Sequence, residues 1–351
     1  MEGESALRLD ELPERYEAIC HEFPDLTGCR VTLQERGSYR LMSPSGSLPA
    51  QVSGRFHYEA TGPLDYPAVG DYVLADLSGG DVAIIHRVLP RTSVFVRKAA
   101  GNAKVGQVVA ANVDVLFVCM ALNADFNLRR LERYLSLGWE SGATPVVLLT
   151  KADLCCDLEE RLSLVEDVSI GVDVIAVSAR EDDGLKEIEP YLVAGTTLSF
   201  VGSSGVGKST LVNALLGEDR IKTGDLRAND TGRHTTTHRE LIVLSGNVVV
   251  IDTPGMRELG VWDVGDGMSF AFSDIEGLAR ACRFADCTHQ TEPGCAVRAA
   301  LERGDLAPDR LASYLKLKAE NAYFENDEAY LATKEKKFKH IAKLNKTNRK
   351  R

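Results

Sequence analysis

The feature that most constrains this chain is a glycine-rich loop at residues 202–209, which reads G-x-x-x-x-G-K-S. It follows the apolar run 198–201 and leads into 211–216, whose apolar residues are spaced as in a helix. Strand, loop and helix in this order form a phosphate cradle, because the glycines let backbone N–H groups turn toward oxyanions and the helix N-terminus adds partial positive charge. We therefore predict a nucleotide phosphate site here. A turn that merely joins a strand to a helix is the alternative, and the four fixed positions and both flanks argue against it.

Within this loop, Lys208 is expected to reach the β- and γ-phosphates, and the Ser209 hydroxyl is expected to bind Mg²⁺. The residues predicted to contact the nucleotide are Gly202, Ser203, Ser204, Gly205, Val206, Gly207, Lys208, Ser209 and Thr210.

The length and the charge distribution restrict the class of protein. A chain of 351 residues suggests two or three domains. The net charge of −10 excludes a protein that is basic throughout, although residues 334–351 hold nine Lys/Arg and one Glu, a local +8 that leaves −18 for the rest. Because the sequence has no apolar run of about 18 residues, no secretory signal and no disulfide-like cysteine framework, we expect a cytoplasmic protein.

The order of apolar patterns predicts the domain organisation. Residues 1–24 are expected to be flexible, and the short β-like runs of 25–101 favour an OB-type β-barrel, with an SH3-like barrel or a small sandwich as alternatives. Arg91, Arg97 and Lys98 near its end suggest either phosphate contacts or a solvated exit loop. Alternating strands and helices over 102–262 predict a doubly wound α/β domain, with a hairpin over 241–251. Residues 263–351 read as helical around a Cys/His cluster.

Three further loops follow apolar strands, where ligands bind in open α/β sheets. Asp252 is expected to hold the Mg²⁺ shell and Gly255 to meet the γ-phosphate. After residue 149, Thr150, Lys151 and Asp153 form a base-recognition loop, in which the Asp153 carboxylate would accept from two guanine N–H groups that adenine does not present. Ser178 and Ala179 are expected to close over the guanine O6. Together with the phosphate loop, these elements predict a guanine-nucleotide site.

The base-recognition loops precede the phosphate loop, the reverse of the order in an ordinary GTPase. In this order, and in the stretches 110–114, 126–134, 232–237 and 252–258 and the cysteine cluster, the chain resembles the circularly permuted GTPases of the RsgA (YjeQ) type. The resemblance covers nearly the whole chain. It implies an N-terminal OB fold, a circularly permuted P-loop GTPase domain, a C-terminal α-helical zinc-binding domain and a role in small ribosomal subunit maturation.

Two positions bear on the activity. The base-recognition motif usually begins with Asn, whereas this chain has Thr150, whose single hydroxyl predicts weaker guanine binding. Met256 stands where Ras-like GTPases place a water-orienting Gln, and a thioether cannot orient water. We therefore assign the water-positioning role to His234, with a structural or RNA-contact role as the alternative, and we expect Thr236 to complete the Mg²⁺ shell. Slow hydrolysis accelerated by a partner is the expectation.

A second metal site is predicted at Cys282, Cys287, His289 and Cys295, which lie within 14 positions of one another. Three thiolates and an imidazole suit a closed, tetrahedral structural zinc site, and the family resemblance covers all four residues. Three buried free cysteines beside a surface histidine are the alternative. A zinc ion held by all four would brace the fold, not catalyse a reaction.

The partner expected from these features is the small ribosomal subunit with its rRNA. Lysines at three- to four-residue steps in the tail (336, 339, 343, 346 and 350) would line one face of a helix and meet phosphates, unless the tail is a solubilising extension. We expect a monomer that binds neither membranes nor DNA. The competing function is an RNA-binding assembly factor in which GTP is an occupancy switch and hydrolysis is incidental. An ATP-using metabolic enzyme is a weaker rival, against which Asp153 argues.

Overall fold

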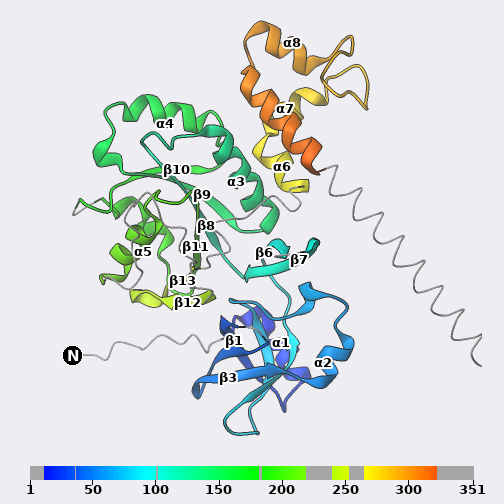
Figure 1. The fold of residues 1–351 in the computed structure, drawn as a ribbon, viewed down its shortest axis with the longest axis vertical. Coiled ribbons are helices and arrows are strands. Elements are labelled where there is room, and N and C mark those ends of the chain that lie inside the picture. The colour runs from blue at the N-terminus through cyan, green and yellow to red at the C-terminus, as the bar shows by residue number, and fades with distance from the viewer. Residues whose placement is uncertain are drawn as a thin grey trace, which may run out of the picture.

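The computed structural model describes residues 12–35, 37–99, 102–181, 184–218, 239–252 and 265–321. A β-barrel, an α/β domain and a group of helices follow one another along the long axis of the molecule (Figure 1). None of the described helices combines the length and the apolar character that a membrane crossing requires.

The barrel consists of five strands: β1 (Thr27–Gln34), β2 (Tyr39–Ser43), β3 (Gly46–Val52), β4 (Tyr72–Asp76) and β5 (Ala83–Val88). Sheet order β1-β2-β3-β5-β4 is closed by pairing of β1 with β4, and only β3 and β5 run parallel. Alternate residues point inward, as in β2, where Tyr39 and Leu41 are buried between exposed or half-buried neighbours. This arrangement confirms the OB-type barrel. Helix α2 (Gly54–Glu59) lies between β3 and β4 in sequence.

Part of the segment expected to be flexible is folded onto the barrel. Residues 14–22 form η1 (Glu14–Tyr16) and α1 (Glu17–Glu22). Tyr16 is buried, packs against Tyr72 and donates its hydroxyl to the Pro90 carbonyl at 2.6 Å. This aromatic anchor explains why a polar segment is ordered.

The α/β domain continues the same sheet in the order β10-β9-β8-β11-β13-β12. Its strands are β8 (Val115–Ala121), β9 (Thr144–Thr150), β10 (Asp173–Val177), β11 (Thr197–Val201), β12 (Arg239–Val243) and β13 (Val249–Asp252). All are parallel except β12, which forms the predicted hairpin with β13. The helical segments are α3 (Leu128–Ser141), η3 (Ala152–Leu154), α4 (Leu158–Glu166), the 3₁₀ helix η4 (Lys186–Tyr191) and α5 (Lys208–Leu216).

Helices cover both faces of this sheet. Leu116 and Val118 of β8 share a core with Leu131 of α3, whereas Phe117 and Cys119 share a second core with residues of α5. Because successive side chains of a strand alternate between faces, these two cores lie on opposite sides. The doubly wound fold is therefore confirmed.

A two-stranded hairpin, β6 (Val94–Ala99) and β7 (Asn102–Ala111), was not predicted and links the barrel to the α/β domain. Hydrogen bonds of Asn112, which follows β7, join the hairpin to the barrel. The Asn112 side chain accepts from the Thr92 N–H at 3.0 Å and donates to the Gly70 carbonyl at 3.1 Å. Arg91 interacts with the buried Asp71 carboxylate at 2.7 Å, so this residue belongs to an internal ion pair.

Contacts between the barrel and the α/β sheet fix their relative placement. β1 pairs with β12 through Leu33 opposite Glu240 and Gln34 opposite Arg239. The buried Arg30 donates to the Thr197 hydroxyl at 2.6 Å, at the first residue of β11. The barrel therefore contacts the strand that leads into the phosphate loop.

The C-terminal part consists of α6 (Gly265–Ala271), α7 (Ser273–Ala279), α8 (Ala296–Arg303) and a helical run over 308–321. Helix α6 packs against α3 so closely that a Cβ at Gly267 would lie 2.1 Å from the Ser136 carbonyl oxygen. Arg310, 4% exposed, donates to Glu132 of α3 at 2.9 Å and to Asp274 of α7 at 2.7 Å. A buried charged contact thus attaches these helices to the α/β domain.

Candidate functional site

The phosphate loop lies between β11 and α5, as predicted. Lys208 is 8% exposed, and its Nζ donates to the carbonyls of Gly202 and Ser203, each at 2.6 Å. Gly202 has φ of 141°, and a Cβ there would lie 2.3 Å from the Cys119 carbonyl oxygen of β8. Gly207 has φ of 103° at the N-cap of α5. The loop therefore needs glycine at both positions, and its lysine is held beneath the loop backbone.

The first base-recognition loop is bonded directly to the phosphate loop. Thr150, at the end of β9, is 3% exposed and donates its hydroxyl to the Val206 carbonyl at 2.5 Å. Lys151 has φ of 61° and donates from Nζ to the Gly205 carbonyl at 2.9 Å. Hydrogen bonds therefore hold the base-recognition loop against the phosphate loop, although the two are more than 50 positions apart in sequence. One nucleotide can contact both loops only if they are adjacent in this way.

The second base-recognition loop contacts the first. Ser178, buried after the end of β10, donates its hydroxyl to Asp153 Oδ1 at 3.0 Å. Asp153 is exposed in η3, and Ala179 is partly buried against the core of the α5 face. The bond holds a carboxylate at the surface in a defined orientation, with acceptor capacity left for a ligand.

The remaining predicted site residues are only partly described. Ser209, half-buried, follows Lys208 in the first turn of α5. Asp252 is the last residue of β13 and pairs with Glu240 of β12. Because β13 runs parallel to β11, its backbone lies at the same end of the sheet as the phosphate loop. Gly255, His234 and Thr236 lie outside the described residues, as does the basic tail.

The hydroxyl of Thr150 braces the phosphate loop. In Thr150→Val, the buried Val206 carbonyl loses its donor, which costs about 1–3 kcal/mol. We expect GTP to bind the variant roughly 10-fold more weakly, a fold-change within that range. Titration with a fluorescent guanine nucleotide measures the change. The matched variant Thr150→Asn, which restores an amide donor, should bind at least as tightly as the natural chain; unchanged affinity in Thr150→Val would contradict the proposed brace.

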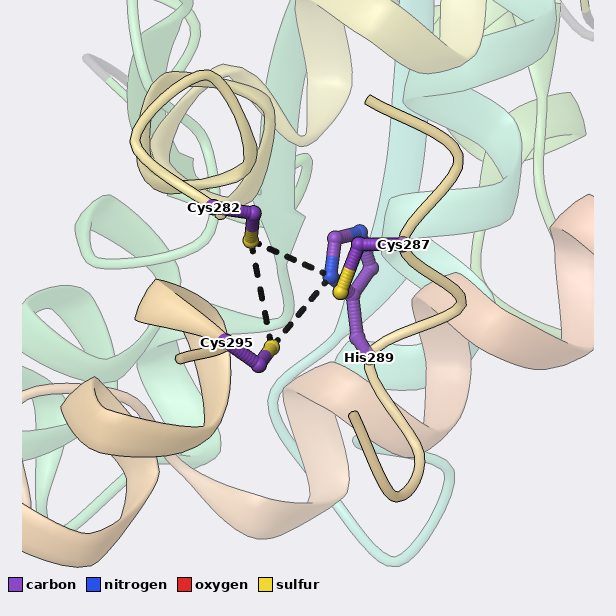
Figure 2. A group of neighbouring side chains, drawn as sticks. All are labelled: Cys282, Cys287, His289 and Cys295. Atoms are coloured by element: carbon purple, nitrogen blue, oxygen red, sulfur yellow. Dashed lines mark hydrogen bonds between the residues drawn. The ribbon is translucent and has the colours of Figure 1, made fainter. Parts of the chain in front are cut away.

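The four predicted metal ligands meet in the C-terminal part (Figure 2). Cys282 follows α7, Cys287 and His289 lie in the next loop, and Cys295 is the N-cap of α8. Their ligand atoms all lie within 4.8 Å of one another. His289 Nδ1 is 3.7 Å from Cys282 Sγ and 3.5 Å from Cys295 Sγ, and the two sulfurs are 3.9 Å apart.

These separations fit the edges of a tetrahedron around one metal ion. Zinc–sulfur and zinc–nitrogen bonds of usual length place S···S pairs about 3.8 Å apart and S···N pairs about 3.6 Å apart. Burial, together with the nearby Lys318, lowers the pKa of His289 and favours the neutral imidazole that metals bind. Burial also acts to raise the pKa of Cys282, but hydrogen bonds from the Val297 and Ala296 N–H groups and from the Cys287 and Cys295 thiols together lower that pKa. The cluster can therefore bind a metal ion.

Comparisons with known proteins agree with this geometry. The family model described as RsgA GTPase matches residues 88–262. "Small ribosomal subunit biogenesis GTPase RsgA 2" of Lactiplantibacillus plantarum is 52% identical, covering 84% of this chain and 83% of the relative. "Small ribosomal subunit biogenesis GTPase RsgA 1" of Oceanobacillus iheyensis is 46% identical, covering 91% and 93%.

Two solved structures are similar in fold. The crystal structure of YjeQ from Thermotoga maritima matches with a TM-score of 0.65 at 24% identity, covering 84% of this chain and 98% of that one. The structure of YloQ, described as a circularly permuted GTPase, matches with a TM-score of 0.62 at 25% identity, covering 85% of this chain and 95% of that one. With relatives of this identity and coverage, and with base-recognition loops that precede the phosphate loop they contact, the chain belongs to the RsgA GTPase family.

Proposed function

We propose that this protein hydrolyses GTP in the late maturation of the small ribosomal subunit, and that the subunit stimulates the hydrolysis. The observation that carries the guanine-nucleotide assignment is the bonded set of three loops, in which Thr150 and Lys151 contact the phosphate loop and Ser178 contacts Asp153. The ribosomal part is supported by the names of the relatives, which describe small ribosomal subunit biogenesis GTPases.

In this proposal each described residue has one task. The loop 202–210 and Lys208 bind the phosphates, and the helix N-terminus of α5 adds positive potential. Asp153, oriented by Ser178, accepts from two guanine N–H groups, while Ala179 closes over the base. Thr150 and Lys151 fix the distance between the base and phosphate subsites by holding the phosphate loop.

Magnesium would be held by Ser209, Asp252 and Thr236, and it would neutralise charge on the phosphates when bound. His234 orients the attacking water, and Gly255 meets the γ-phosphate. At the second site, Cys282, Cys287, His289 and Cys295 bind one zinc ion, a choice supported by the Cys₃His donor set and its separations. This ion braces the C-terminal helices.

We divide the chain into an N-terminal segment (1–24), of which residues 14–22 fold onto the barrel, an OB-fold domain (25–101), a GTPase domain (102–262) and a zinc-binding domain with a basic tail (263–351). The protein acts as a cytoplasmic monomer whose partner is the small subunit and its rRNA, with the basic tail meeting RNA phosphates.

The variant His234→Ala tests the enzymatic proposal. Turnover of GTP should fall by about 10²–10⁴-fold, because general acid–base or water-positioning groups contribute that much. GTP affinity should stay within a few-fold. Single-turnover assays with and without purified small subunits measure both the basal and the stimulated rate, and His238→Ala is the matched control. Unchanged stimulated turnover would instead favour a factor that uses GTP only as an occupancy switch.

A further inference from the structure

The loop that carries two of the metal ligands exposes an aromatic ring beside an arginine. Phe284 lies between Cys282 and Cys287 in sequence and is 41% exposed. The guanidinium of Arg283 lies 5.4 Å from the centre of the Phe284 ring. Arg280, three residues before Arg283 and at the C-cap of α7, is exposed as well. A single exposed ring is common on protein surfaces, but a ring with a guanidinium beside it combines a flat apolar face with a positive charge.

Neither of these two arginines has a carboxylate partner within the described residues. Elsewhere in 265–321, Arg298 pairs with Glu302, Arg303 with Asp305, and Arg310 with Asp274. Over the described part of the chain, no ion pair involves Arg280 or Arg283. The guanidinium groups of Arg280 and Arg283 are therefore available to an anion.

The backbone that presents the ring is held in place. The Arg283 N–H donates to the Gly294 carbonyl at 3.1 Å, and the Cys287 N–H donates to the Phe284 carbonyl at 3.3 Å. A Cβ at Gly294 would lie 3.1 Å from the Arg283 Cβ, so the arginine stem lies against this glycine. The metal ligands Cys282 and Cys287 lie on either side of Phe284 in sequence, so this segment is already ordered. A partner that binds it therefore loses little free energy to ordering the loop.

We infer that Arg283 and Phe284 form a binding surface for single-stranded RNA, on which one unstacked base stacks on the ring while Arg280 and Arg283 meet the adjacent phosphates. Nucleobases are the ligands that combine a flat apolar face with nearby anionic groups, and stacking on aromatic side chains beside arginine is the usual mode for single strands. This inference rests on the proposed function, since it names the part of the surface that contacts RNA.

The experiment uses the full zinc-loaded chain and a labelled single-stranded oligoribonucleotide of about 12 nucleotides. Phe284→Ala should weaken binding about 10-fold, the usual effect of losing one stacked base. Phe284→Trp should keep the affinity within about 2-fold, because it keeps a stacking face. Phe270→Ala is the matched control: Phe270 is also exposed, but its ring faces Trp139. Equal zinc content in all variants establishes that the metal site is intact.

Salt dependence gives a second readout. Arg283→Ala should reduce the slope of log affinity against log salt by about 0.7, the value for one phosphate contact on a single strand, and Arg283→Lys should keep the slope. The inference would be overturned if Phe284→Ala bound the oligoribonucleotide with natural affinity, whether or not this variant bound the small subunit more weakly. Stimulation of the natural chain by the small subunit is measured in parallel. If the small subunit did not stimulate the natural chain, the proposed function would be overturned. If it did, and Phe284→Ala still bound RNA with natural affinity, only the proposed RNA-binding surface would be overturned.

Discussion

Lys208→Ala should lower GTP turnover by about 10²–10³-fold, the usual cost of losing one preorganised donor to a reacting group. The ammonium is held beneath the loop by the Gly202 and Ser203 carbonyls, so in the natural chain it is in position before the phosphates arrive. Its loss removes the positive charge of a side chain that is only 8% exposed, and charges of buried groups are weakly screened by salt.

A steady-state GTPase assay measures this effect, with Lys186→Ala as the control, since Lys186 is an exposed lysine of the same domain. Lys208→Arg should also be strongly impaired, because a planar guanidinium cannot replace the compact ammonium between two carbonyls. An unaltered melting temperature would separate a chemical effect from unfolding. Near-natural turnover in Lys208→Ala would contradict the assigned phosphate site.

Cys287→Ala should abolish zinc binding and unfold the helices of 265–321. Structural zinc sites contribute about 10–16 kcal/mol of apparent binding free energy, which is more than a small helical unit has in reserve. The ligands connect the end of α7 to the start of α8, so both helices lose their junction when the metal leaves. A chelator should have the same effect on the natural chain.

Zinc content by atomic absorption and the rate of limited proteolysis within 265–321 measure this prediction. Cys156→Ala is the matched control, because Cys156 is exposed and lies outside the cluster. GTP affinity should change little, since the bonds that join the base and phosphate loops come from Thr150 at the end of β9, Ser178 after β10 and the loop before α5, all outside 265–321. A variant that keeps one zinc per chain and resists protease as well as the natural protein would refute the structural role of the site.

Local patterns were sufficient to predict much of this fold. The barrel strands are short β-like runs separated by turn residues, the strands of the α/β sheet are continuous apolar runs, and the metal ligands are chemically distinctive and close in sequence. The order of loops along the chain also indicated the family. These features depend on residues near one another, which is why they can be read without a structure.

Contacts between distant residues could not be predicted in this way. The β6–β7 hairpin has Gly101 and Gly106 within or beside its strands, and these interrupt the strand pattern. The Arg310–Glu132 contact joins positions 178 apart, and no local pattern marks either residue as buried. Likewise, the bond from Lys151 to Gly205 depends on a left-handed backbone at Lys151, whereas the sequence predicted only that the residue belongs to the site.

The most direct test of the account is the affinity of the natural chain for GTP and for ATP, measured with magnesium in the same titration format. Two hydrogen bonds to the Asp153 carboxylate, each worth about 1.5–3 kcal/mol, predict a preference for GTP of at least about 100-fold. That preference should vanish in Asp153→Ala. Equal affinity of the natural chain for the two nucleotides, or a preference that survives Asp153→Ala, would contradict the claim that this carboxylate selects guanine above the loop that ends at Lys208.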